Sequence, residues 1–208
     1  MHTNCSEFEI KVELHAPDDA AELLRSLRLV KSEFVTDVYF DTVKRELFKR
    51  GVFLRLRNCS TLEVKFNPDI GDASHLSCQE HRYTLPLSAC DKQGITEFLE
   101  AHIDCRHGPF ESDPFALFQL EEFVRIVKER TVYCGGETEV SLDRIPGLGD
   151  FLEVEARGPT GRQSAVEFCA KNGLRNLPLG YVELWLRKHD FSTYRTGRYV
   201  LPEDRSPA

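Results

Sequence analysis

Hydrophobic and polar residues alternate with a period of two along much of the chain, a pattern typical of strands with one apolar face. In the segment 7–15, for example, Phe8 and Ile10 alternate with Glu7, Glu9 and Lys11. The alternation predicts eight strands, over residues 7–15, 33–41, 52–58, 61–67, 76–87, 121–134, 137–144 and 149–157. Each of these strands is expected to have one apolar and one charged or polar face.

Helical spacing of apolar residues separates groups of these strands. It predicts helices over residues 17–29, 91–103, 160–172 and 181–188. Residues 105–118 contain two prolines and a glycine, so we expect an irregular connection there. We expect residues 1–190 to form one domain and the polar residues 191–208 to form a loosely held tail.

The order of elements predicts an α+β fold made of an antiparallel sheet in two similar halves. Eight strands are enough to close a β-barrel. Closure would place the charged faces inside and the apolar faces outside, under the helices. Such an interior is tolerated only if its charges compensate one another or bind ions and a ligand.

The charged faces of the strands carry both signs in unusual density. The acidic positions are Glu7, Glu9, Asp143, Glu153 and Glu155. The basic positions are Lys11, Arg55, Arg57, Lys65, Lys128 and Arg130. Carboxylates are the ligands that hard divalent cations prefer, and Arg and Lys bind the phosphates that those cations accompany. The pattern therefore favours a binding site over a merely solvated face.

Composition narrows the classes of partner. The chain has 208 residues, 41% of them hydrophobic, and a net charge of −7, which argues against nucleic acid or an anionic membrane as the main partner. It has no apolar run long enough to span a bilayer, and no secretory signal is visible. The seven cysteines form no CxxC pair, so we expect free thiols in a reducing cytoplasm. Monomer and homodimer both remain open.

The charged motifs, taken together and in order, resemble those of CYTH domains, the triphosphate tunnel metalloenzymes. The motifs that carry the resemblance are Glu7-Phe8-Glu9-Ile10-Lys11, Tyr39-Phe40-Asp41-Thr42, Leu54-Arg55-Leu56-Arg57, Glu63-Val64-Lys65, Lys128-Glu129-Arg130, Leu142-Asp143, Glu153-Val154-Glu155 and Gly180-Tyr181-Val182-Glu183-Leu184. They extend over residues 7–188, nearly the whole expected domain.

The resemblance implies an eight-stranded antiparallel tunnel that hydrolyses or cyclises a small-molecule triphosphate with Mg²⁺ or Mn²⁺. It implies that the metal ligands are Glu7, Glu9, Asp143, Glu153 and Glu155, and that the triphosphate is held by Lys11, Arg55, Arg57, Lys65 and Arg130. Lys128 is a further candidate for the triphosphate, or else a surface charge at the tunnel mouth. Lys65, Glu9 and Glu153 are the candidate catalytic residues.

Two positions depart from the thiamine triphosphatases of this family. Gly180 stands where those enzymes have a lysine, and Phe53 stands where they have a tryptophan. The substrate therefore stays open among tripolyphosphate, thiamine triphosphate and nucleoside triphosphates. We favour hydrolysis, because it needs only the tunnel and a water molecule. The alternatives are a class IV adenylate cyclase that makes cAMP from ATP and a non-catalytic phosphoanion-binding module.

Four further polar residues have two readings each. Glu63 either takes part in the site or pairs with a cation across the sheet. Glu80 and Arg82 form an ion pair in or near the tunnel or contact the ligand. Asp41 is either a functional residue or a turn and cap residue.

Overall fold

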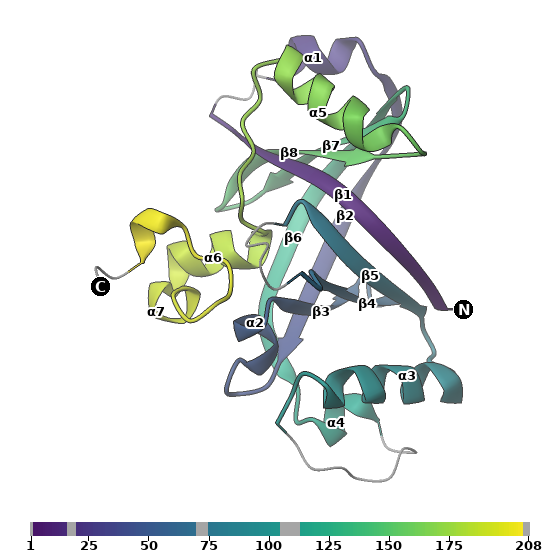
Figure 1. Cartoon of the computed structure of the whole chain (residues 1–208), viewed down its shortest axis with the longest axis vertical. Coiled ribbons are helices and arrows are strands. Elements are labelled where there is room, and N and C mark those ends of the chain that lie inside the picture. Colours follow the sequence, from purple (N-terminus) through teal and green to yellow (C-terminus); the bar gives the residue numbers. More distant parts are fainter. Residues whose placement is uncertain (1, 16–19, 70–74, 105–112, 206–208) are drawn as a thin grey trace.

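The protein folds into a closed antiparallel β-barrel with helices on its outside, as predicted (Figure 1). The computed structural model describes residues 2–15, 20–69, 75–104 and 113–205. Its eight strands close in the order β1-β5-β4-β3-β2-β6-β7-β8. They are β1 (His2–Leu14), β2 (Arg28–Asp41), β3 (Val52–Arg57), β4 (Thr61–Phe66), β5 (Ser77–Thr84), β6 (Glu121–Gly135), β7 (Thr138–Ile145) and β8 (Gly149–Ala156).

The helices occupy the connections and the C-terminal region. They are α1 (Ala21–Arg25), α2 (Glu46–Lys49), α3 (Ala89–Glu100), α4 (Pro114–Leu117), α5 (Gly161–Lys171), α6 (Tyr181–His189) and α7 (Phe191–Tyr194), with a short 3-10 turn over Pro202–Asp204. In Figure 1, α3 and α5 lie at opposite ends of the molecule. None of the described helices has the length and hydropathy needed to cross a bilayer.

Apolar residues on the outer face of the barrel pack against these helices. Leu54 and Val64, on neighbouring strands, belong to one buried cluster with Ile95 and Leu99 of α3. A second cluster joins strands β1, β7 and β8 to α5, through buried residues such as Val154. Burial of this apolar surface drives the packing. The opposite, charged positions of the same strands are left to face the interior.

Strand β1 closes the barrel by changing partners part-way along its length. Its first half pairs with β5 as far as Phe8, opposite Ser77. From Glu9, opposite Glu155, it pairs with β8. The two acidic residues Glu7 and Glu9 therefore lie where the barrel passes from one sheet neighbour to the next.

The predicted helix over residues 17–29 is wrong over most of its length. Within its described part, only Ala21–Arg25 are helical, and β2 already begins at Arg28. Residues 28–34 pair with 129–134 of β6, a partner about a hundred residues away. Helical spacing cannot reveal such a partner, and hydrogen bonding to β6 overrides the local preference. Residues 17–19 lie outside the described part of the chain.

Residues after 190 are not loosely held in the described part of this segment. Tyr194 and Tyr199 are buried in the same core cluster as Phe48. The Tyr194 hydroxyl accepts a hydrogen bond from the Leu201 amide at 2.9 Å and donates one to Asp204 at 3.1 Å. The polar composition that suggested a loose tail is outweighed by two aromatic rings that find a place in the core.

The predicted connection over residues 105–118 contains one short helix in its described part. Asp113 caps α4 by accepting a hydrogen bond from the Phe115 amide. Residues 105–112 lie outside the described part. The prediction of free thiols holds for the five cysteines with described side chains, Cys59, Cys78, Cys90, Cys134 and Cys169.

Candidate functional site

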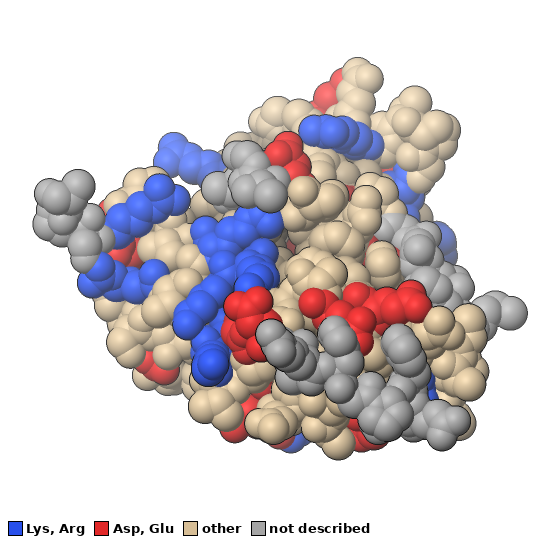
Figure 2. All heavy atoms as spheres, turned by 60° about the horizontal axis from the view of Figure 1, so that its bottom comes forward, with Lys and Arg blue, Asp and Glu red and all other residues tan. Residues whose placement is uncertain are grey.

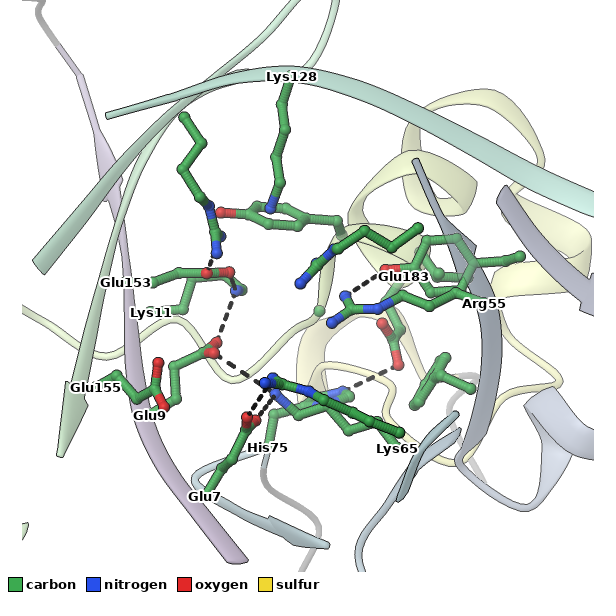
Figure 3. A pocket seen from close by; sticks show the side chains of 18 residues that line it. Glu7, Glu9, Lys11, Arg55, Lys65, His75, Lys128, Glu153, Glu155 and Glu183 are labelled. Carbon is green, nitrogen blue, oxygen red and sulfur yellow. Dashed lines mark hydrogen bonds and ion pairs between the residues drawn. The ribbon is translucent and has the colours of Figure 1, made fainter. Parts of the chain in front are cut away.

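A charged cavity lies inside the barrel, between the strands and the first turn of α6 (Figure 3). Its lining residues are Glu7, Glu9, Lys11, Tyr39, Phe53, Arg55, Arg57, Lys65, His75, Arg82, Lys128, Arg130, Glu153, Glu155 and Gly180 to Glu183. Every predicted site residue except Asp143 is among them. Side chains more than a hundred positions apart in sequence thus converge on one cavity.

The carboxylates of β1 and β8 form one side of the cavity. Strand register places Glu9 opposite Glu155 and Lys11 opposite Glu153. The Lys11 ammonium donates to Glu9 at 3.0 Å and also forms a close ion pair with Glu153. Figure 3 shows Glu7, Glu9 and Glu155 together on this side. We call Glu7, Glu9, Glu153 and Glu155 the carboxylate group.

Lys65 of β4 reaches the carboxylate group from the other direction. Its Nζ lies 3.1 Å from Glu7 Oε2 and 3.5 Å from Glu9 Oε2. Burial opposes the charge on Lys65, but Glu9 and Glu7 outweigh it and raise its pKa well above the ordinary lysine value. Lys65 therefore stays positively charged at neutral pH.

Two arginines of β3 are held from behind by buried acids. Arg57 donates to both carboxylate oxygens of Asp37, at 2.8 and 3.0 Å. Arg55 Nε donates to Glu63 at 2.6 Å, and its Nη1 donates to the Tyr39 hydroxyl at 3.3 Å. These contacts fix the guanidinium groups before any ligand binds.

Sequence analysis did not identify Asp37 as part of this arrangement. Asp37 stands directly opposite Arg57 in the register of β2 and β3. Its parity matches that of Tyr39, two residues on, which lines the cavity. That parity was the available signal. The alternation along 33–41 is weak, however, because apolar or aromatic residues occur at both parities, as at Val38 and Tyr39.

Asp143 lies behind the cavity wall instead of lining it. Its side chain is fully buried and accepts from Lys128 Nζ at 2.7 Å, Arg130 Nε at 2.7 Å and the Tyr181 hydroxyl at 2.8 Å. Asp143 therefore neutralises two of the predicted phosphate-binding cations from the rear. Its predicted role as a metal ligand stays a prediction.

Tyr181 of α6 connects the two sides of the cavity. Its ring lies under both ammonium groups, with Lys11 Nζ 4.0 Å and Lys128 Nζ 4.6 Å from the ring centroid. Such contacts stabilise a buried cation. The resemblance at residues 180–184 marked this position in the sequence, but only the fold shows what the ring touches.

The cavity has an excess of acid at one point and of base at another. Burial, together with the negative charge of Glu7, raises the pKa of Glu155 to about 7. Burial opposes ionisation of Glu7 too, but Lys65 and other partners outweigh it and lower its pKa to about 2. Burial and the positive charge of Arg130 lower the pKa of Lys128 to about 8. Burial makes the charged forms of Glu155 and Lys128 costly, so an ion of opposite charge beside either group would stabilise it.

The donor set fits a hard divalent cation. Among the described residues, no three His, Cys, Asp or Glu side chains stand together in a metal-binding arrangement. Glu9 and Glu7 instead form ion pairs with Lys11 and Lys65. The carboxylate group offers only oxygen donors, which suits Mg²⁺ or Mn²⁺. Burial, and after it the negative charge of Glu7, raises the pKa of Glu155, and a bound cation would stabilise its charged form.

The four polar residues for which the sequence left two interpretations all form hydrogen bonds or ion pairs with other residues of the protein. Glu63 binds Arg55, as described above, and is absent from the cavity lining. Arg82 forms ion pairs with Glu80 and, at 3.2 Å, with Glu7, and it also lines the cavity. Asp41 accepts hydrogen bonds from the Thr42, Leu47 and Phe48 amides and so caps the turn into α2.

The outer surface repeats the separation of charges. On the face shown in Figure 2, Lys and Arg side chains form a continuous band beside a group of Asp and Glu. The net charge of −7 thus coexists with a local basic surface.

The chain belongs to the CYTH domain family, whose model matches residues 6–172, and this confirms the resemblance seen in the motifs. A protein named "Putative adenylate cyclase" from Methanocaldococcus jannaschii is 26% identical over 153 residues, which are 72% of this chain and 75% of that protein.

Solved structures share the fold. A conserved hypothetical protein from Pyrococcus furiosus superposes with a TM-score of 0.59 at 21% identity, covering 86% of this chain and 99% of that one. A Hippeastrum protein, described as a "putative adenylyl cyclase" with a dominant triphosphatase activity, superposes with a TM-score of 0.56 at 17% identity, covering 96% and 100%. Identities this low support the fold alone.

Proposed function

We propose that this protein hydrolyses the terminal phosphate of a triphosphate compound with Mg²⁺ or Mn²⁺. The observation that carries the proposal is the division of one cavity into a carboxylate group and a set of anchored cations. The triphosphatase activity named for the Hippeastrum protein of the same fold supports it. So does membership of the CYTH domain family.

The basic residues bind the triphosphate and hold it in one orientation. Arg55 and Arg57 are fixed by their rear acids and present guanidinium groups that match phosphate oxygens. Lys11, Lys128 and Arg130 supply further positive charge around the cavity. A triphosphate carries about four negative charges, and these donors would bind its oxygens in one orientation while the rear acids hold the donors in place.

The carboxylate group would hold the metal, with Glu9 and Glu153 at its centre. A bound divalent ion supplies charge neutralisation and activation of water. Water attacks the terminal phosphorus, the bond from that phosphorus to its bridging oxygen breaks, and inorganic phosphate, a diphosphate and one proton released to the solvent result. Lys65 keeps its proton, so its role is to stabilise charge on the leaving oxygen and not to act as a base.

The carboxylate group favours an enzyme over a non-catalytic binding module. A site that only captured phosphate anions would gain nothing from four glutamates in the same cavity, since they repel the ligand. Those glutamates become useful once a metal ion links them to the phosphates.

The test is phosphate release from tripolyphosphate, thiamine triphosphate and ATP with Mg²⁺ and then with Mn²⁺. Glu9→Gln is expected to reduce release by roughly 10²-fold or more. Glu13→Gln is the matched control, because Glu13 lies on the same strand and parity but is exposed outside the cavity. It is expected to leave the rate unchanged.

Three results would contradict the proposal. Release that persists in EDTA would exclude a metal-dependent reaction. Formation of cAMP from ATP in place of phosphate would make the protein a cyclase, in line with the name of the Methanocaldococcus relative. Tight binding of all three compounds without turnover would favour the phosphoanion-binding module.

A further inference from the structure

The outer face of strands β2 and β6 carries apolar side chains that remain exposed. Seven large apolar side chains are exposed in the described part of the chain, and four of them lie on these two strands: Leu29, Val30, Phe34 and Val127. Phe34 is 78% exposed. Val127 directly precedes Lys128, which lines the cavity, so the Val127 side chain points out of the barrel. The two strands thus present an apolar surface to solvent.

None of the described helices covers this face. Helix α3 shares one core cluster with β3 and β4, and α5 shares another with β1, β7 and β8. Phe34 and Val127 belong to none of the core clusters of the described residues. Figure 1 shows β2 and β6 running along the molecule between α5 at one end and α3 at the other. An apolar patch that its own chain leaves uncovered often marks a surface for another molecule.

A hollow lies beside Phe34 on the same face. Its lining includes Phe34, Val127, Ile145 and Pro146, and on its polar side Glu129 and Arg144. The face therefore combines a protruding aromatic ring with a partly apolar hollow. A surface that carries both a projection and a recess can pack against a copy of itself, which is what a twofold-symmetric interface requires.

The charges on this face are also arranged to suit a second copy. Strand register places Phe34 opposite Glu129, and Glu129 opposite Arg144 of β7. Within the described part of the chain Glu129 forms no ion pair, and Arg144 forms a long one, 3.8 Å to Asp150. A twofold axis between β6 and β7 would bring each Glu129 to the Arg144 of the other copy. A polyanion or a polycation would meet a like charge here instead.

We propose that a second copy of this chain docks on the outer face of β2, β6 and β7 and that docking buries Phe34 of both copies. The exposed residues 28–36 of β2 extend over about 30 Å, and three neighbouring strands are about 14 Å wide. Each copy would bury about 400 Å² before the relief of the side chains is counted, against about 800 Å² in a standard interface. We therefore expect a reversible dimer with a micromolar Kd. This inference does not depend on the proposed function.

The first test is sedimentation velocity of the full chain between about 1 and 200 µM, a range that includes a micromolar Kd. The wild-type protein is expected to pass from monomer to dimer as its concentration rises. Phe34→Glu is expected to raise the Kd at least about tenfold, because it places a buried charge at the centre of the interface. Val43→Glu is the matched control, because Val43 is 72% exposed but follows the end of β2, outside this face. It is expected to dimerise like the wild type.

The second test exchanges the two charges. Glu129→Arg and Arg144→Glu are each expected to remain monomeric, because each places like charges opposite one another in its own dimer. An equimolar mixture of the two variants is expected to dimerise, because opposite charges then meet at both contacts. Loss of folding cannot produce this recovery, since neither chain changes on mixing.

Several outcomes would overturn the proposal. A wild-type protein that stays monomeric throughout the concentration range leaves this face to a different partner. A dimer that persists in Phe34→Glu uses another surface. Equal weakening by Phe34→Glu and Val43→Glu, or a mixture of the charge variants that stays monomeric, would exclude the specific contacts assigned here.

Discussion

Replacing Asp143 with asparagine is expected to destabilise the fold by about 3–5 kcal/mol, even when no metal is present. The carboxylate is fully buried, and Lys128, Arg130 and Tyr181 all donate to it. Asparagine keeps the shape but removes the charge, and its amide group faces donors where an acceptor stood. Two cations then remain buried side by side without their shared counter-ion.

The magnitude follows from what is left unpaired. Hydrogen bonds to charged groups contribute about 1.5–3 kcal/mol each, but those at one carboxylate are not additive. Breaking a buried pair by removing one partner costs about 3–5 kcal/mol. For a chain of this length the corresponding fall in Tm is about 6–20 °C.

The pH dependence has a definite sign. Lys128 already has a pKa of about 8, lowered from its ordinary value by burial and by Arg130. Removing the Asp143 charge lowers the pKa of Lys128 in the folded protein further. Lys128 then loses its proton in the folded protein at a lower pH, whereas in the unfolded chain it keeps the proton up to its ordinary pKa. Stability of Asp143→Asn is therefore expected to rise more steeply than that of the wild type as pH increases from 7 to 9.

The assay is urea unfolding in EDTA, followed by the fluorescence of Trp185, the one tryptophan in the sequence. Asp150→Asn is the matched control, because Asp150 is partly exposed and lies 3.8 Å from the half-exposed Arg144, a long ion pair. It is expected to change stability by less than about 1 kcal/mol. A similarly small loss for Asp143→Asn would refute the anchoring role and leave metal binding as the reason for this residue.

Two other consequences concern the metal and the C-terminal segment. The affinity for Mn²⁺ is expected to rise about tenfold between pH 6 and pH 8, because Glu155, with a pKa of about 7, must lose its proton to bind a cation. Calorimetry should find this rise flattened in Glu155→Gln, and equal slopes in the two proteins would contradict the assignment. Tyr199→Ala is expected to cost about 3–5 kcal/mol in urea unfolding, because the ring is buried. Phe191→Ala, at a residue 45% exposed, should cost less than about 1 kcal/mol, and equal losses would show that the segment packs differently.

Several features could be predicted because they depend on local pattern. Alternation along 52–57 and 61–66 identified two strands and the face that carries Arg55 and Lys65. The short gaps between the predicted strands 52–58 and 61–67, and between 121–134 and 137–144, favour hairpins, and hairpins impose antiparallel order. The helix over 181–189 was recognised from its own residues as well. These properties require no knowledge of distant partners.

Other predictions failed where a distant partner decided the outcome. Residues 28–32 became a strand because β6 offered hydrogen bonds. Tyr199, in a segment that looked polar, found its place against Phe53 and His75. The residues that pack against these segments are distant in sequence, so the local sequence cannot reveal the contact.

The sequence by itself determined that the chain has eight alternating strands, and it determined nearly all the charges that face inward. Strand parity assigns a side chain to a face, and that assignment is local. Only the tertiary structure decided how deep each side chain lies and what it meets. It placed Asp143 behind Lys128, and it brought Glu183 to His75, 108 positions away. Barrel closure and strand register set these distances, and both depend on the whole chain at once.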